Sequence, residues 1–345
     1  MLRGDSARRP DPGLPWLVAD IGGTNARFGW VRDPARGVEQ VRRLAVTEHA
    51  DLGDAVQAYL TALPRAGGAA AAPRRAAFAI ASPIDGDADE VALTNSPWRL
   101  SRRALRADLG LESLLLLNDF EALSLALPRL RPAQLRPTAG PAWSQPAHGT
   151  LAVVGPGTGL GVGGVTELPA GRGWLALPGE GGHATLAPTD DFESALLAWV
   201  RRQRPHVSAE RLLSGTGLPL LHAAVVAVVG APSPAATPLD SAAAVITQAL
   251  AGDADAGRTI DTFCALLGSF SGNVALTLGA RGGVAIGGGV VPRLGERFFA
   301  SRFRERFEAK GRFAPYLAAV PTALISDTLA ALDGALLALE QSAPG

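Results

Sequence analysis

The chain has 345 residues, of which 47% are hydrophobic and 19% are charged, and its formal net charge at pH 7 is zero. This composition supports a sizeable core and excludes global disorder, and the length suits two domains or one large one. Zero net charge gives no reason to expect nucleic acid or an anionic membrane as a partner. The single cysteine, Cys264, lies in an apolar run, so we interpret it as a buried small hydrophobe rather than part of a disulfide or metal site.

The start of the chain is rich in Arg, Pro and Gly and lacks the apolar segment of a secretory signal. We therefore expect residues 1–16 to form a disordered tail. The longest apolar stretch, 218–229, contains His222 and is too short to span a bilayer. These features predict a soluble, cytoplasmic protein.

The first predicted element is a buried strand at 17–21, which contains Asp20 and is followed by Gly22, Gly23 and Thr24. Apolar residues return at 28–31, so the pattern predicts a hairpin. Its glycines leave room for a ligand, and successive N–H groups at such a tip can hold an anion. Asp20 beside them would suit a divalent metal or a metal-bound water. An ordinary Gly-Gly turn with a solvated Asp20 stays open as the alternative.

The rest of the first half predicts a mixed sheet covered by helices, with strands at 38–46, 76–81, 91–93 and 114–117 and helices at 52–63 and 101–109. Asn118 and Asp119 follow the last of these strands and open a helix that ends before Pro128. Either residue would serve as a helix N-cap. Alternatively, a carboxylate at the carboxyl end of a strand could act as a general base toward a hydroxyl nucleophile.

Residues 129–149 are rich in proline and read as a connection between domains. A second strand, glycine-rich tip and returning strand follow at 151–154, 155–161 and 162–165. This repeats the pattern of the first hairpin. Two such hairpins, each followed by α/β material, suggest two related domains that face each other across a cleft.

Glu180 and His183 lie three residues apart in a glycine-rich loop. A metal site is poorly supported, because no further His or Cys stands at ligand spacing, and sugar hydroxyls suit the pair better. Glu210 is either one more acceptor or a charge in the first turn of a short helix at 208–211. Together with Asp119, these carboxylates disfavour an anionic substrate.

The second half continues with helices at 192–201, 218–229, 242–250 and 258–278, a strand at 284–286, a surface helix at 298–307, a strand at 322–325 and a terminal helix at 329–340. A third glycine-rich turn, 287–289, follows a strand. None of the three turns is a Walker loop or a good dinucleotide fingerprint. Three of them together suit one extended nucleotide that is gripped from two sides.

Six stretches in this order resemble the bacterial glucokinase family of the hexokinase type, within the actin-like sugar-kinase superfamily. They are DIGGTNAR (20–27), LNDF (117–120), GTGLG (157–161), LPGEGGH (177–183), HVSAER (206–211) and GGVVPR (288–293). The resemblance extends from about residue 17 to residue 339. It implies an α/β fold of two actin-like (ribonuclease H-like) domains, each with a mixed sheet and helices, around a cleft. The small domain would comprise 17–128 plus 325–345, and the large domain 129–324.

The same resemblance implies transfer of the γ-phosphoryl group of Mg·ATP to the 6-hydroxyl of glucose, the first step of glycolysis, by a homodimer. Asp119 would be the catalytic base and would touch the sugar. The other residues that would hold the glucose hydroxyls are Asn118, Glu180, His183 and Glu210. The residues that would bind ATP are Asp20, Gly22, Gly23, Thr24, Asn25, Gly157, Thr158, Gly159, Gly288 and Gly289. Asp20 would also orient Mg²⁺ through water.

Two departures from the family pattern stand out. Pro156 replaces a frequent Ala, and 329–333 replaces a Pro-Gly-Leu-Leu-Gly run. The Cys-rich zinc motif of the ROK branch is absent, which argues against that branch. The rivals are a kinase for another neutral sugar such as mannose or fructose, a regulator that only binds glucose, and a phosphatase. The few residues before the first strand leave no room for a DNA-binding helix-turn-helix, which weighs against the regulator. Polyphosphate or ADP stays open as the phosphoryl donor.

Overall fold

The computed structural model describes residues 13–64, 72–84, 88–93, 96, 98–144, 146–230 and 239–342. The chain divides into two compact units: unit 1 comprises Met1–Ala126 and Leu329–Gly345, and unit 2 comprises Leu127–Thr328. The sequence-based prediction placed the boundaries after residue 128 and before residue 325. The predicted tail at 1–16 lies outside the described residues as far as residue 12, and the first strand already begins at Trp16.

Unit 1 is built on a five-stranded mixed sheet with the order β3-β2-β1-β4-β7. Its strands are β1 (Trp16–Ile21), β2 (Asn25–Val31), β3 (Glu39–Ala45), β4 (Arg75–Ile80) and β7 (Ser113–Asn118). Strand β2 runs antiparallel to both of its neighbours, β1 and β3, whereas β4 runs parallel to β1 and β7 runs parallel to β4. The predicted hairpin at the start of the chain is therefore confirmed. A separate two-stranded sheet pairs β5 (Glu90–Ala92) with β6 (Arg99–Ser101).

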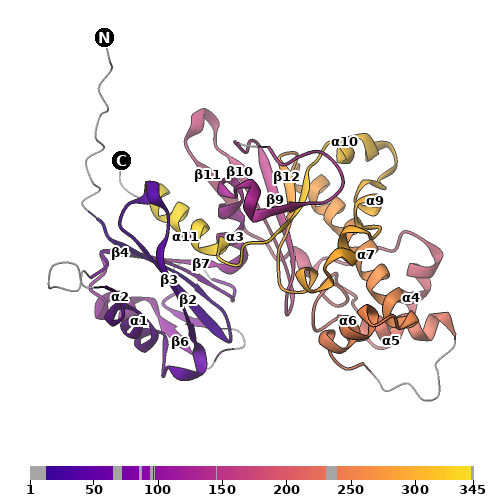
Figure 1. Cartoon of the computed structure of the whole chain (residues 1–345), viewed down its shortest axis with the longest axis horizontal. Helices are drawn as coiled ribbons and strands as arrows, with labels where there is room; N and C mark the ends of the chain where they lie inside the picture. Colours follow the sequence, from indigo (N-terminus) through magenta and orange to yellow (C-terminus); the bar gives the residue numbers. More distant parts are fainter. Residues whose placement is uncertain are drawn as a thin grey trace, which may run out of the picture. The chain divides into compact units, whose positions relative to one another are not determined.

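Helices cover both faces of this sheet (Figure 1). They are α1 (Leu52–Thr61), α2 (Arg102–Asp108), α3 (Asp119–Ala126) and α11 (Ala330–Gln341). Successive residues of a strand point to opposite faces. Accordingly Leu17, Ala19 and Ile21 of β1 belong to the core that includes α1 and α2, while Trp16 and Val18 belong to the core that includes α11.

Unit 2 is built on a six-stranded mixed sheet with the order β11-β10-β9-β12-β13-β8. Its strands are β8 (Leu135–Pro137), β9 (Thr150–Pro156), β10 (Leu160–Glu167), β11 (Trp174–Leu177), β12 (Gly283–Ile286) and β13 (Thr322–Ile325). The hairpin β9–β10 is antiparallel, and β12 runs parallel to β9. The second predicted hairpin is therefore confirmed as well.

The helices of unit 2 are α4 (Asp191–Arg201), α5 (Leu218–Val229), α6 (Ala242–Leu250), α7 (Ala254–Leu278), α8 (Glu296–Phe299), α9 (Phe303–Glu308) and α10 (Ala314–Ala318). The long helix α7 is buried along most of its length, and Cys264 lies on it. Burial raises the pKa of the Cys264 thiol to about 12, so the side chain stays neutral and behaves as an apolar group. The interpretation of Cys264 as a buried hydrophobe is confirmed. No described helix is both long enough and apolar enough to cross a membrane.

The surface helix predicted at 298–307 is wrong. The chain forms two short helices there, and Phe298, Phe303 and Phe307 are buried in the core of unit 2. The break lies at Ser301, whose hydroxyl donates to the carbonyl of Phe298 (2.6 Å) and accepts from the N–H of Phe303 (3.2 Å). A serine that satisfies the backbone in this way competes with the helix.

The short helix predicted at 208–211 is also wrong, because this segment forms turns. The N–H of Ala209 donates to the carbonyl of Ala184 (2.9 Å), and the N–H of Glu210 donates to that of Gly182 (2.8 Å). Cross-chain bonds of this kind divert the backbone from a helical ladder. The prediction also missed β6, β8 and β11, which have only three or four residues each.

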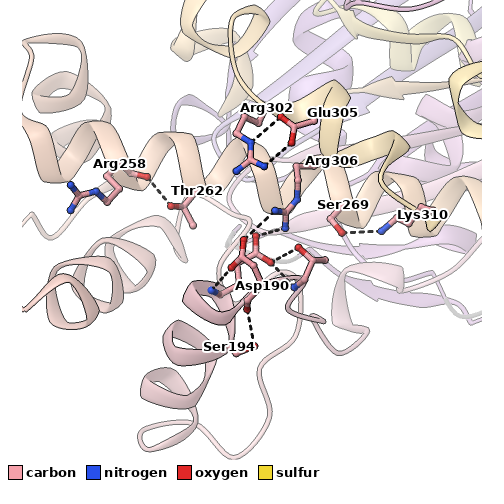
Figure 2. Close-up of polar contacts among 11 residues, drawn as sticks. Asp190, Ser194, Arg258, Thr262, Ser269, Arg302, Glu305, Arg306 and Lys310 are labelled. Carbon is pink, nitrogen blue, oxygen red and sulfur yellow. Dashed lines mark hydrogen bonds and ion pairs between the residues drawn. The ribbon is translucent and has the colours of Figure 1, made fainter. Parts of the chain in front are cut away.

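A buried ion pair joins α9 to the start of α4 in unit 2. The guanidinium of Arg306 pairs with the carboxylate of Glu193, and a second nitrogen lies 3.3 Å from Asp190 Oδ2 (Figure 2). Glu193 also accepts from the N–H of Thr189 (2.7 Å) and from its hydroxyl (2.9 Å). A buried pair is tolerated when further hydrogen bonds satisfy its charges. The cluster fixes the segment that precedes α4, which is continuous with the loop that contains Glu180.

Candidate functional site

In unit 1 the tip of the first hairpin is a tight turn after Asp20. The N–H of Gly22 donates to the carbonyl of Asn25 (2.9 Å), and the N–H of Val46 donates to that of Thr24 (2.9 Å). Thr24 is exposed. A Cβ on Gly22 would touch only Asn25 O, at 3.4 Å, and its φ is not in the left-handed region. The backbone conformation at position 22 therefore does not require glycine. The missing side chain instead leaves the backbone of the turn uncovered.

Asp20 faces Arg27 across this hairpin. Its Oδ2 accepts from Arg27 Nη1 at 2.8 Å, and its side chain is 16% exposed. Loss of solvent raises the pKa of Asp20 above its usual value, and the Arg27 guanidinium only partly offsets this. A carboxylate kept at such a position is a candidate for function. The predictions included Arg27 in the motif but gave it no role.

Asn118 and Asp119 lie at the same sheet edge as the 22–25 turn. The parallel register aligns Ile21 with Ile80 and Ile80 with Asn118, so the carboxyl ends of β1, β4 and β7 are level. The N–H of Phe120 donates both to Asn118 Oδ1 and to Asp119 Oδ1, each at 2.9 Å. The N-cap interpretation therefore holds for Asn118, and Asp119 is the first residue of α3.

The sequence-based prediction missed two residues that hold Asn118. Its side-chain amide donates from Nδ2 to the carbonyl of Ser82 (3.0 Å), and its N–H donates to Glu121 Oε2 (3.4 Å). Burial raises the pKa of Glu121. An acid three residues after a capping residue is a capping-box pattern, so the contact of Glu121 with Asn118 could have been predicted from the sequence. Ser82 carried none, because its contact uses only the backbone carbonyl.

In unit 2 the second and third glycine-rich turns lie side by side. Val154 is aligned with Ile286 in the parallel pair β9–β12, so the turns that follow share one sheet edge. The N–H of Val290 donates to the carbonyl of Pro156 (3.0 Å). Gly288 has φ +73°, and a Cβ there would lie 2.3 Å from the same carbonyl oxygen. Only glycine fits at 288, whereas a Cβ on Gly289 or Gly157 would meet nothing within 4 Å.

The 157–159 turn is held by a segment to which the prediction gave no role. The N–H of Gly215 donates to the carbonyl of Gly157 (2.8 Å), and both the N–H and the hydroxyl of Thr216 donate to the carbonyl of Thr158 (3.3 and 3.1 Å). The side chain of Thr158 is exposed. The sequence signal in this segment is the Ser-Gly-Thr-Gly run at 214–217.

The loop with Glu180 and His183 lies against this same hairpin. Residues 181–183 form a 3₁₀ helix, and a Cβ on Gly182 would lie 2.0 Å from the carbonyl oxygen of Leu160. Glu180 is exposed, and the side chain of His183 is 62% exposed. His183 Nδ1 lies 3.9 Å from Glu210 Oε1. Unit 2 thus brings His183, Glu210 and the 157–159 turn together, and it places Glu180 at the start of the same short helix.

The candidate site does not hold enough side-chain ligands to bind a metal ion by protein groups alone. Among the described residues no group of three or more His, Cys, Asp or Glu side chains could hold a metal ion. Asp20 offers one carboxylate, which suits an ion that keeps most of its water and phosphate ligands, as Mg²⁺ does. The residues present therefore fit a metal that arrives with a nucleotide.

A surface hollow elsewhere in unit 2 contains none of the predicted residues. It is lined by residues of α6, α7 and α8, among them Asp261 and Arg297. Arg297 Nη2 donates to Asp261 Oδ2 (3.0 Å) and to the carbonyl of Gly257 (2.9 Å). Asp261 and Arg297 are paired with each other, and we assign the hollow no part in the site.

Comparison with known proteins identifies the family. A model of the glucokinase family matches residues 17–342. The chain is 46% identical over 332 residues to a glucokinase of Aromatoleum aromaticum, and this alignment covers 96% of each protein. It is 46% identical over 314 residues to the bifunctional protein glk of Burkholderia pseudomallei, covering 90% of this chain but 46% of that protein. The chain therefore spans about half the length of that bifunctional relative.

A solved structure gives the same result for the fold. The crystal structure of a glucokinase from an Antarctic psychrotroph superposes with a TM-score of 0.84 at 35% identity, and the match covers 95% of this chain and 99% of that one. The predicted α/β fold with two sheet-bearing parts is thus confirmed. All the predicted site residues lie inside the family match. The chain belongs to the glucokinase family.

Proposed function

We propose that this protein transfers the γ-phosphoryl group of Mg·ATP to the 6-hydroxyl of glucose and releases glucose 6-phosphate and ADP. The observation that carries the proposal is the placement of Asp119, which follows Asn118 at the carboxyl end of β7, level with the 22–25 turn. Asn118 is fixed by Ser82 and Phe120, and the N–H of Phe120 also donates to the carboxylate of Asp119.

Asp119 is the general base of this reaction. Its carboxylate takes the proton of the 6-hydroxyl while that oxygen forms a bond to the γ-phosphorus and the bond from this phosphorus to the bridging oxygen breaks. Asn118, Glu180, His183 and Glu210 hold the sugar hydroxyls. A phosphoryl transfer needs positioning and charge stabilisation more than covalent chemistry, and side chains on sheet-edge loops supply both.

The glycine-rich turns hold the nucleotide. The residues proposed for ATP are Asp20, Gly22, Gly23, Thr24, Asn25, Gly157, Thr158, Gly159, Gly288 and Gly289. The uncovered backbone at Gly289 supports this, because a phosphate could approach the N–H group there. Asp20 orients the Mg²⁺ of the nucleotide through water, and the ion neutralises phosphate charge during transfer. We further propose that the protein acts in the cytoplasm as a homodimer at the first step of glycolysis.

The decisive experiment replaces Asp119 with Asn and measures glucose 6-phosphate formation in a coupled assay. Removal of a general base lowers turnover by about 10²- to 10⁴-fold. Asp191→Asn is the matched control, because Asp191 is the exposed first residue of α4 just as Asp119 is the first residue of α3. Near-normal turnover of Asp119→Asn would refute the role of Asp119 as the base.

Two further measurements test the kinase activity itself. Absence of ADP release from ATP by the wild type with glucose would refute the proposed kinase activity. A panel of hexoses and phosphoryl donors then tests the substrates.

A further inference from the structure

The carboxylate of Glu210 is shared between two loops of unit 2. Its Oε2 accepts from the N–H of Leu160 at 2.9 Å, at the point where the 157–159 turn enters β10. The backbone N–H of the same residue donates to the carbonyl of Gly182 at 2.8 Å, inside the loop that contains His183. Glu210 therefore touches the nucleotide side of the proposed site with its side chain and the sugar side with its backbone.

The second carboxylate oxygen faces the sugar side. Glu210 Oε1 lies 3.9 Å from His183 Nδ1, and the side chain is 32% exposed. This oxygen can accept from a sugar hydroxyl while the first oxygen stays on Leu160. A carboxylate has about four acceptor sites, so the two tasks do not compete.

Gly159 makes room for this arrangement. A Cβ at that position would lie 2.3 Å from Glu210 Oε2 and 3.2 Å from its carboxyl carbon. The φ of Gly159 is not in the left-handed region, so its backbone conformation does not demand glycine. The atoms that a Cβ would meet belong to the end of a flexible side chain. A methyl group at 159 would therefore move the carboxylate without breaking the fold.

We infer that Glu210 is a positioning residue that links the sugar loop to the phosphate turn, so that glucose and Mg·ATP each bind more tightly when the other is present. The inference rests on the proposed function, because it concerns the same two substrates. A sugar hydroxyl on Oε1 restrains the carboxylate, and the restrained carboxylate holds Leu160 and the end of the turn. Coupling between two ligands is reciprocal by thermodynamic necessity.

The first test changes the phosphate turn and measures the sugar. Glucose binding to Gly159→Ala is followed by calorimetry in the absence of nucleotide. We expect its Kd to rise about tenfold or more, the loss typical of a misplaced hydrogen bond to a charged group. Gly157→Ala is the matched control in the same turn, where a Cβ meets nothing within 4 Å. Its glucose Kd should stay within about twofold of the wild type, because without nucleotide its own contact with phosphate plays no part.

The second test changes the carboxylate and measures the nucleotide. The Kd of Mg·AMPPNP is compared with and without saturating glucose. In the wild type glucose should lower this Kd several-fold, and in Glu210→Ala the ratio should fall to about one. Glu210→Gln keeps an oxygen for the N–H of Leu160, so its nucleotide Kd without glucose should match the wild type. A purely structural residue would change the nucleotide Kd equally with and without glucose, so the ratio of the two Kd values in Glu210→Ala would stay at the wild-type value.

The outcomes separate the inference from the proposed function. If the wild type phosphorylates glucose but Gly159→Ala binds glucose as tightly as Gly157→Ala, the link through Glu210 is wrong and the kinase stands. If glucose leaves the nucleotide Kd of the wild type unchanged, the coupling is equally wrong. If the wild type binds no glucose, both the coupling through Glu210 and the proposed glucokinase function are wrong.

Discussion

At the scale of single residues, the clearest sign of function in unit 1 is Asp20, a mostly buried acid with a raised pKa. Asp20 has a raised pKa because loss of solvent outweighs the attraction of Arg27. A carboxyl group whose pKa is higher in the folded state than in the unfolded chain favours folding only while it is protonated. As the pH rises through the folded pKa, that contribution is lost, so ionised Asp20 destabilises the protein at neutral pH.

Asp20→Asn should therefore be more stable than the wild type at pH 7. The gain should shrink as the pH falls toward 3.8, the ordinary pKa of the side chain, and vanish below it. Phosphoryl transfer should fall at the same time, because Asp20 is the residue that we propose to orient Mg²⁺. Urea unfolding of both proteins across this pH range checks the first part, and the coupled assay checks the second.

Asp190→Asn is the control of opposite sign. The pKa of Asp190 is lowered, chiefly by the backbone N–H of Glu193 and also by Arg306, so its contribution is present above the ordinary pKa and is lost as the pH falls. This variant should be less stable than the wild type at pH 7. If both variants shift stability in the same direction, the pKa argument for Asp20 is wrong.

The sequence could identify these side chains but not what holds them. Asp20, Asn118 and Asp119 stand out because strands end beside them, and local rules are enough to see this. For Asn118, sequence alone left the cap and the functional role open. The structure shows that a cap and a fixed amide coexist, and the amide depends on Ser82, which lies 36 residues away in the chain. Contacts to a backbone carbonyl leave no trace in residue identity.

At the scale of elements, the helix that begins at Asp119 depends on close packing against α11. A Cβ on Gly334 of α11 would lie 1.7 Å from the carbonyl oxygen of Ala122 and 3.0 Å from the backbone nitrogen of Ala126, both in α3. The two helices therefore touch backbone to backbone at this glycine. Local sequence pattern predicted each helix, but their contact joins residues far apart in the chain and could not be predicted from local pattern.

Gly334→Ala should destabilise unit 1. Alanine in place of glycine inside a helix normally stabilises by about 1 kcal/mol. Here the methyl group meets backbone that cannot turn aside, and overpacking of this kind costs about 1–3 kcal/mol or more. We expect a lower Tm and, because α3 shifts, a lower kcat. Thermal unfolding followed by circular dichroism measures the first effect.

Gly53→Ala is the matched control in α1 of the same unit. A Cβ there meets only the carboxylate end of Asp51, at 3.2 Å, and Leu105 Cδ1, at 4.0 Å. The general preference for alanine should dominate, and the Tm should stay level or rise. Equal effects of the two substitutions would show that the α3–α11 contact is not tight.

On the scale of the whole molecule, unit 1 is assembled from both ends of the chain. Leu332, Leu336 and Leu339 of α11 pack in one core with Trp16 and Val18 of β1. Arg75 of β4 reinforces this, because its guanidinium donates to the carbonyl of Leu339 (3.0 Å). Unit 2, in contrast, is continuous, and its sheet and main core lie between residues 127 and 328.

From the sequence, the division into two units could be predicted only from the repeated hairpin pattern and from the resemblance to a family. Both glycine-tipped hairpins were visible as alternations of strand and turn, and they are β1–β2 and β9–β10. The strand orders were not predicted, because β4 lies next to β1 and β12 next to β9 through pairings far apart in the chain. Such pairings are decided by tertiary packing rather than by local propensity.

Removal of residues 329–345 should therefore unfold unit 1 and leave unit 2 folded. Burial of Leu332, Leu336 and Leu339 alone contributes about 5 kcal/mol or more, comparable with the whole stability of a typical domain. Hydrogen exchange of the truncated chain should show lost protection in β1 and β4 and retained protection in α7. A fragment of residues 127–328 should protect α7 as the full chain does, because it keeps every strand of its sheet. Persistent protection of β1 in the truncated chain would mean that α1 and α2 alone can hold the sheet, and that α11 serves to position α3 rather than to complete the core.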